Sequence, residues 1–224
     1  MVIIWILSTK ELKLFHIFAI IMEMLCKGGM FMYKMCKTAQ SAQRQRELEL
    51  GLLEAMKTRH YEEISISELC TELGIPRKTF YRYFDSKEGA LYGLIDHTLM
   101  EYEGFSFDYL SSGNRKLQRE LEQFFLFWLD KRPLLDVLRD SGLSGILFER
   151  AISFALSDTV MPRRFLPEDT EDMQRHITMF GVCGLLSMVL SWHDGGFAES
   201  AVDLSVVATR LLEKPLFPGV EDFL

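Results

Sequence analysis

The sequence is poor in the residues that build disulfide frameworks and metal sites. Its 4 cysteines stand far apart, with no C-x-x-C motif and no cluster with histidine (Cys26, Cys36, Cys70 and Cys183). This spacing excludes a zinc-ribbon or disulfide-rich fold and predicts reduced thiols in a cytoplasmic protein. We therefore expect no metal ion and no other cofactor.

Signals for catalysis are equally scarce. The 5 histidines show no H-x-x-x-H or H-E-x-x-H spacing, and the chain has neither a Walker sequence nor a G-x-G-x-x-G element. His193 and Asp194 are an isolated adjacent pair, which is more simply explained by a histidine near a helix end. These absences predict that the protein is not an enzyme.

Helix-breaking residues and strand patterns are also few. The 224 residues include 6 prolines and 15 glycines, and no alternation of apolar and polar residues is sustained. The long periodic segments follow helical spacing instead. The sequence therefore predicts an all-α protein with an N-terminal helix-turn-helix domain and a larger C-terminal helical domain.

The first 36 residues form an apolar, methionine-rich extension that charged residues interrupt between positions 10 and 13. Its longest clean apolar run, residues 14–22, is far shorter than the ~20 residues of a bilayer span, and it lacks signal-peptide features. The favoured explanation is a start of translation at Met30, Met32 or Met35, with no membrane partner. The alternative is an amphipathic arm that lies on a membrane or on the protein's own body.

Residues 65–91 carry most of the functional information. Ser65 with Glu68 three residues on forms a capping box, which predicts the start of a helix. Leu69 and Leu73, four apart, share one apolar face of that helix. The segment therefore begins with a short amphipathic helix.

A tight turn and a second short helix follow. Gly74 supplies the left-handed conformation that ends the first helix, and Pro76 suits the first position of the next. Phe80 and Phe84 pin the second helix to the first and leave its cations facing outward. A further capping box at residues 85–88 predicts a third helix. This is the sequence form of a helix-turn-helix, whose second helix enters the major groove of DNA.

The run Thr79-Phe-Tyr-Arg-Tyr-Phe-Asp-Ser-Lys-Glu-Gly-Ala-Leu91 resembles the signature of the TetR family of bacterial transcriptional regulators. The resemblance covers about 50 to 60 residues, which is one DNA-binding domain. His60 precedes Tyr61 where the family usually has glycine, and histidine tolerates the positive φ that glycine would supply. Tyr83 stands where many members have histidine, and its hydroxyl can also reach a phosphate.

Position and resemblance together imply roles for individual side chains. Base-edge contacts are expected from Arg77, Lys78 and Thr79, because a cation reads guanine O6 and N7 and a threonine methyl meets that of thymine. Phosphate contacts are expected from Ser65, Ser67, Tyr81, Tyr83 and Lys87. The core of the helix-turn-helix is expected to contain Leu69, Leu73, Gly74, Phe80 and Phe84.

The formal net charge of −7 is unusual for a DNA-binding protein. Residues 37–92 contain 9 cationic and 9 acidic side chains, so the rest of the chain carries the whole excess. Non-specific affinity scales with the number of phosphates neutralised. A positive tip on an acidic body therefore fits recognition of a specific site better than coating of DNA.

We expect three segments: the extension (1–36), the helix-turn-helix domain (37–102), and a helical effector-binding and dimerisation domain (103–224) with a linker at 104–115. Helical periodicity in the last segment predicts five helices, at 117–129, from 133, at 143–156, at 168–192 and at 198–213.

The resemblance implies that the C-terminal domain binds a ligand and that its last two helices pair with their copies. Small residues recur on one face of the penultimate helix and support close helix packing, in a dimer or in an ordinary crossing within the chain (Gly181, Gly184, Ser187 and Ser191). A ligand pocket would draw on aromatic residues and methionine, most of which belong to the core (candidates Phe124, Trp128, Phe148, Phe180, Met188 and Trp192).

The sequence thus predicts a homodimeric transcriptional regulator that binds a double-stranded DNA operator. The favoured mechanism is repression that a small hydrophobic or aromatic effector releases. A co-regulator controlled by a partner protein is the alternative.

Overall fold

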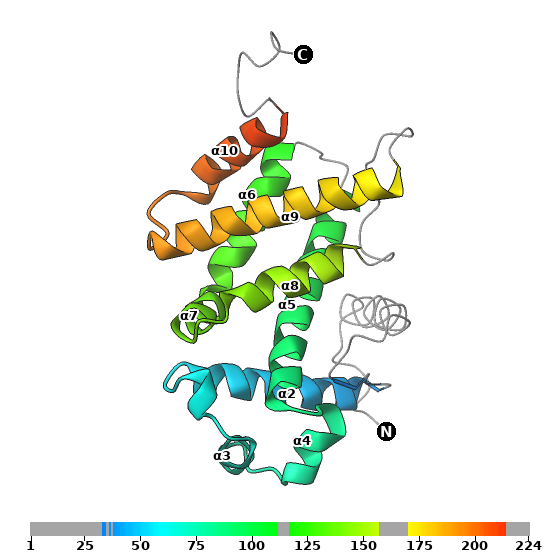
Figure 1. The fold of residues 1–224 in the computed structure, drawn as a ribbon, viewed down its shortest axis with the longest axis vertical. Helices are drawn as coiled ribbons and strands as arrows, with labels where there is room; N and C mark the ends of the chain where they lie inside the picture. The colour runs from blue at the N-terminus through cyan, green and yellow to red at the C-terminus, as the bar shows by residue number, and fades with distance from the viewer. Residues whose placement is uncertain (1–32, 35, 37, 112–116, 157–169, 214–224) are drawn as a thin grey trace, which may run out of the picture.

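The computed structural model describes residues 33, 34, 36, 38–111, 117–156 and 170–213 (Figure 1). Throughout these residues the regular structure is helical, apart from an isolated β-bridge between Tyr33 and Phe84. The predicted all-α fold is confirmed. The hypotheses about where translation begins concern residues that lie largely outside the described part.

The helix-turn-helix unit occupies one end of the molecule (Figure 1). It consists of α2 (Ala39–Met56), a short 3-10 turn η2 (Tyr61–Glu63), α3 (Ile66–Glu72) and α4 (Arg77–Tyr83). The long helix α5 (Lys87–Ser111) packs on α2 and leads away from the unit toward the other helices.

The turn between α3 and α4 follows the predicted local signals. Ser65 caps α3 by accepting the amide of Glu68 at 3.1 Å, and the Glu68 carboxylate reaches back to the Ser65 amide. Gly74 has a φ of +63°. The amides of Gly74 and Ile75 donate to the carbonyls of Thr71 and Cys70, which is the hydrogen-bond pattern of a Schellman motif.

Three local predictions differ from the structure by small shifts. Pro76 stands one position before α4 rather than at its first residue. The third helix is capped by Ser86, whose hydroxyl accepts the Gly89 amide at 3.0 Å, and not by Asp85. His60 has a φ of −61°, so this position needs no left-handed residue.

Two other expectations are wrong. The predicted linker from residue 104 is helical as far as Ser111, because Gly104 sits inside α5 without ending it. Leu73 is not a core residue, since its side chain is 36% exposed. It lies over Gly51 of α2, where the absence of a Cβ leaves room for its methyl groups.

The remaining helices form the larger half of the molecule. The structure describes α6 (Leu117–Asp130), α7 (Arg132–Asp140), α8 (Ser144–Leu156), α9 (Glu171–Asp194) and α10 (Ala201–Glu213), all within a few residues of the predicted bounds. Helix α6 packs on α10 and α8 packs on α9, while α8 also packs on α5. Buried residues of both halves belong to one connected core, so α5 and α8 join the two halves through a packed interface.

Candidate nucleic-acid interface

Helix α4 separates its apolar and cationic side chains onto opposite faces. Phe80 and Phe84 are fully buried and contact each other with ring centroids 5.3 Å apart. Arg77, Lys78 and Arg82 are exposed on the other face. The buried pair thus fixes the helix on the core and leaves its cations facing solvent, as the sequence predicts.

Ion pairing explains how a neutral segment presents a positive surface. Four cations that lie outside α4 form ion pairs with carboxylates of the same domain (Arg44–Glu47, Arg46–Glu49, Lys57–Glu54 and Arg59–Glu72). Within the described residues, no carboxylate pairs with Arg77, Lys78 or Arg82. Three exposed cations without a carboxylate partner in the described residues therefore lie together on α4.

Tyr81 and Arg77 support each other on this face. The Arg77 guanidinium lies 5.9 Å from the centroid of the Tyr81 ring and 3.5 Å from its hydroxyl oxygen. Tyr81 is 40% exposed, so its hydroxyl remains accessible. The pair thus lies side by side on the solvent face of α4.

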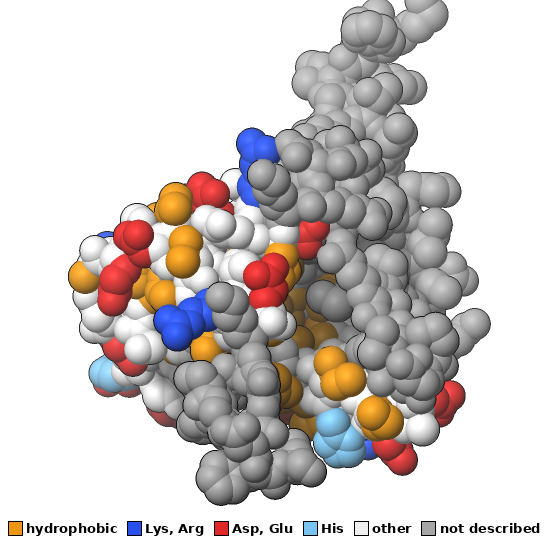
Figure 2. All heavy atoms as spheres, turned by 90° about the horizontal axis from the view of Figure 1, so that it is seen from above, with side chains coloured by type: hydrophobic (Ala, Val, Ile, Leu, Met, Phe, Trp, Pro, Cys, Tyr) orange, Lys and Arg blue, Asp and Glu red, His pale blue; other side chains and the backbone are white. Residues whose placement is uncertain are grey.

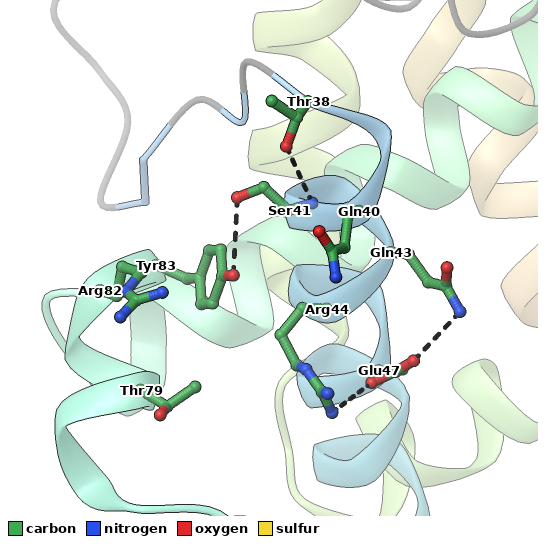
Figure 3. Close-up of a pocket in the computed structure, with 9 residues that line it drawn as sticks. All are labelled: Thr38, Gln40, Ser41, Gln43, Arg44, Glu47, Thr79, Arg82 and Tyr83. Carbon is green, nitrogen blue, oxygen red and sulfur yellow. Dashed lines mark hydrogen bonds and ion pairs between the residues drawn. The ribbon is translucent and has the colours of Figure 1, made fainter.

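A groove of about 520 Å³ runs between α4 and the first half of α2 (Figure 3). Its walls are polar and include Arg44 from α2, which pairs with Glu47 in the same wall, and Arg82 from α4. Tyr83 is buried to 5% exposure, yet its hydroxyl lines this groove, 3.5 Å from the Ser41 hydroxyl. Tyr83 therefore has only its polar tip at the surface.

Sequence reasoning missed the contribution of α2 to this surface. The helix begins with polar residues, and Thr38 caps it by accepting the Ser41 amide at 3.2 Å. The amides of the first helical turn are partly without partners in the helix and favour an anion nearby. The available signal was the polar run Gln40-Ser-Ala-Gln-Arg44 immediately before the apolar part of α2.

The two serines predicted to bind phosphate differ in whether their hydroxyls already have hydrogen-bond partners. The Ser65 hydroxyl donates to the Glu68 carboxylate at 2.7 Å and is occupied by the capping box. These bonds also lower the pKa of Glu68. Ser67 is exposed on α3. Ser67 therefore stays a predicted phosphate contact, while Ser65 already has a structural partner.

Lys87 is engaged inside the domain rather than directed at a phosphate. Its ammonium donates to the carbonyl oxygens of Tyr61 and Ile64, at 2.5 and 2.8 Å. It also lies 4.1 Å from the centroid of the Tyr61 ring. Partial burial lowers the pKa of this lysine. Lys87 thus ties the start of α5 to η2, a role that the resemblance did not imply.

The predicted pocket residues do not gather around one site. Phe124 and Trp128 are buried on α6, and Phe148 is half-buried against the core. Met188 and Trp192 line an open hollow of about 540 Å³ together with Leu204 of α10 and residues of the turn before that helix. Phe180 is 64% exposed, so its assignment to a pocket wall within this chain is wrong.

The predicted dimerisation residues lie largely at the surface. Gly184, Ser187 and Ser191 are exposed on α9, and Gly181 is half-buried. The same exposed stripe continues toward the start of the helix with Met173, Ile177 and Phe180. The sequence prediction located the small half of this stripe and missed its large apolar half.

Residues 52–91, which extend from α2 to the start of α5, match the family model described as bacterial regulatory proteins of the tetR family. This segment is a DNA-binding domain of the TetR family. The match includes α3, the Gly74 turn and α4, the elements that form the cationic surface. TetR-family proteins are transcriptional regulators that bind DNA, and they are in general not enzymes.

The HTH-type transcriptional regulator EthR of Mycolicibacterium smegmatis is 37% identical over 75 residues, which are 31% of this chain and 34% of that protein. The chain thus matches about a third of this relative's length. Among solved structures, that of the dihydroxyacetone kinase operon activator DhaS aligns with a TM-score of 0.49 at 16% identity, covering 75% of this chain and 93% of the other.

Proposed function

We propose that this TetR-family regulator binds a specific double-stranded DNA operator through α4. The observation that carries the proposal is the segregation of side chains on α4. Phe80 and Phe84 are fixed in the core, and cations that no described carboxylate pairs with face solvent. A helix held in this way can enter the major groove as a rigid body.

The exposed residues of α4 divide into two groups. Arg77 and Lys78 lie in its first turn, the part of a recognition helix that reaches base edges, with Thr79 half-buried beside them. Tyr81 and Arg82 lie further along the helix, and Arg82 adjoins the polar groove between α4 and α2. We assign the first group to base contacts and the second to phosphates, joined by Arg44 and the beginning of α2.

Fluorescence anisotropy with the full-length protein tests this proposal. The DNA lying upstream of the chain's own gene is compared with a scrambled duplex of the same composition over a series of salt concentrations. Tight and sequence-selective binding is expected. Weak binding that ignores sequence would contradict direct operator recognition and favour the co-regulator that depends on a partner protein.

We propose that the operator-binding unit is a homodimer formed through α9, in keeping with a family whose members typically dimerise. The exposed stripe of α9 is large and apolar at Met173, Ile177 and Phe180 and small at Ser187 and Ser191. Two antiparallel copies related by a two-fold axis near Gly184 would place the large half of each against the small half of the other. Such an isologous contact is self-complementary.

Helix α9 is also long and apolar enough to cross a membrane, judged by length and composition alone. Its most apolar window has a mean hydropathy of 1.3, and 22% of that window is buried in the chain. The large exposed apolar residues form one stripe, with Asp172, Arg175 and His176 also exposed near its beginning. A one-sided stripe favours a protein partner over lipid.

For the effector, we propose an apolar molecule with one hydrogen-bond acceptor, bound beside α6. Trp128 is 1% exposed, and its indole N–H has no hydrogen-bond partner among the residues that the structure describes. Phe124 and Phe127 lie against its ring, with centroids 6.4 and 5.6 Å away. A buried donor without a partner is costly, so a ligand carbonyl or hydroxyl oxygen would gain by meeting it.

Hydrophobic side chains are also visible on the face of the molecule that Figure 2 shows. Seen from above, the face is hollowed between two lobes, and hydrophobic side chains appear inside the hollow (Figure 2). We propose that effector binding beside Trp128 shifts the dimer away from its DNA-binding arrangement and so releases repression, through higher affinity for the state that does not bind DNA.

A screen for compounds that release operator DNA, repeated with Trp128→Phe, tests the effector proposal. A compound that uses the indole N–H should lose about tenfold in affinity for the variant, because one hydrogen bond is lost in a buried site. Compounds that act equally on both proteins would contradict the assigned donor.

A further inference from the structure

Two residues that precede the predicted helix-turn-helix domain, Tyr33 and Lys34, contact the end of its recognition helix. We call residues 33 and 34 the strap. Tyr33 forms an antiparallel bridge with Phe84, the residue that ends α4, and the Lys34 amide donates to the Tyr83 carbonyl at 2.7 Å. Carbonyls at the end of a helix lack partners within it. The strap therefore satisfies and fixes the end of α4.

The side chain of Tyr33 reaches the joint between the two halves of the molecule. Its hydroxyl donates to Asp96 Oδ2 at 2.8 Å. Arg150 donates to both oxygens of the same carboxylate, at 2.8 Å from Nε and 2.6 Å from Nη2. Asp96 lies on α5 and Arg150 on α8, so one carboxylate accepts bonds from the strap and from the C-terminal half.

Burial makes this arrangement sensitive to displacement. Asp96, Arg150 and Tyr33 are 2%, 4% and 4% exposed. Burial raises the pKa of Asp96, and the Arg150 guanidinium opposes that rise. A buried carboxylate that loses part of its hydrogen bonding is strongly destabilised. Movement of α8 along α5 must therefore rearrange Asp96 and the Tyr33 hydroxyl bond together.

We propose that Tyr33 is a positioning residue that couples the joint of α5 and α8 to the end of the recognition helix. Its backbone holds α4, while its hydroxyl senses the geometry of the Asp96–Arg150 pair. This coupling rests on the proposed function, because it matters for regulation only if α4 binds the operator. It gives the C-terminal half a contiguous physical route to the DNA-facing helix.

Hydrogen exchange of the full-length protein without DNA tests the coupling. Tyr33→Phe removes the hydroxyl and keeps the ring and backbone, and Arg150→Lys keeps the charge but loses the bidentate bond. Both should speed the exchange of α4 amides by at least about threefold, while α3 amides keep their rates. The matched control is Tyr92→Phe, which removes a hydroxyl bonded to Glu88 of the same helix and should leave α4 exchange unchanged.

The double variant distinguishes coupling from two independent effects. If both residues act through Asp96, Tyr33→Phe with Arg150→Lys should speed α4 exchange no more than the stronger single substitution does. The proposal would be overturned if α4 amides exchanged at the wild-type rate in either single variant, or if α3 amides were accelerated as much as those of α4. It would also be overturned if the effects of the two substitutions added independently in the double variant. Since the assay contains no DNA, these outcomes leave the operator proposal to its own test.

Discussion

Replacement of Lys87 by methionine separates a structural role from a DNA-contacting one. The structure directs the ammonium to the carbonyls of Tyr61 and Ile64, whereas the resemblance implied a phosphate contact. Methionine keeps most of the length and apolar volume of the lysine stem, so the substitution removes chiefly the charge and its hydrogen bonds. We expect the domain to be less stable, while the salt dependence of its DNA binding stays unchanged.

The expected loss of stability follows from these contacts. Hydrogen bonds to a charged donor contribute about 1.5–3 kcal/mol each when buried, and less at a half-exposed site where water can replace them. The cation–π contact with the Tyr61 ring adds about 0.5–1 kcal/mol. We therefore expect unfolding free energy to fall by about 2 kcal/mol, which lowers Tm by roughly 4–8 °C in a chain of this size.

Arg82→Met is the matched control, because Arg82 is exposed and has no ion pair in the described part of the chain. Its stability should stay within about 0.5 kcal/mol of the wild type. The slope of log affinity against log salt should become shallower by about one unit. Thermal unfolding and anisotropy are measured for both variants. A stable Lys87→Met protein with a shallower salt slope would contradict the structural role of Lys87 and restore its predicted phosphate contact.

Three further substitutions test other parts of the account. Arg77→Ala should cost about 1–3 kcal/mol of operator affinity and relax the sequence preference at one base pair, measured by anisotropy with single-base variants of the operator; uniform weakening on all duplexes would show a phosphate contact instead. Gly74→Ala should destabilise the protein by about 1–2 kcal/mol in urea unfolding, because a residue with a Cβ disfavours the φ of +63° at this position. An added Cβ would meet no atom within 4 Å, so the cost is conformational, and Gly74→Asn should cost less. Phe180→Asp should weaken dimerisation at least about 100-fold in sedimentation equilibrium, while Leu126→Asp, at an exposed position of α6, should not; a dimer insensitive to Phe180→Asp would contradict the α9 interface.

The sequence was sufficient to predict the features that depend only on neighbouring residues. The Ser65–Glu68 capping box and the Gly74 turn each involve residues at most a few positions apart, and both are present. The apolar pair Phe80 and Phe84 was equally readable, because residues four apart share one face of a helix.

Features that depend on distant residues were not predictable. Lys87 contacts carbonyls more than 20 residues earlier in the chain, so its own surroundings in sequence give no sign of them. Leu73 fits the apolar face of α3, but its neighbour is Gly51 of α2, which leaves it at the surface. The partnership of Tyr33 with Asp96 likewise joins residues 63 positions apart.

The hydrophobicity of a residue also does not tell whether it packs inside its own chain or against another chain. Phe180 was assigned to a pocket because aromatic residues usually occur inside the chain, and the structure places it on an exposed stripe. Burial within one chain and burial between two chains produce the same sequence pattern. Only the packing of α9 on α8 shows which of its faces is free.

Cyclic selection of duplexes from a random pool by the full-length protein, followed by sequencing, is the most direct test of the central claim. A two-fold dimer with α4 in the major groove should enrich an inverted repeat whose half-sites are centred about one helical turn, or a multiple of it, apart. Arg77→Ala should lose selectivity within each half-site. Failure to enrich any sequence above the starting pool would contradict specific operator recognition by this protein.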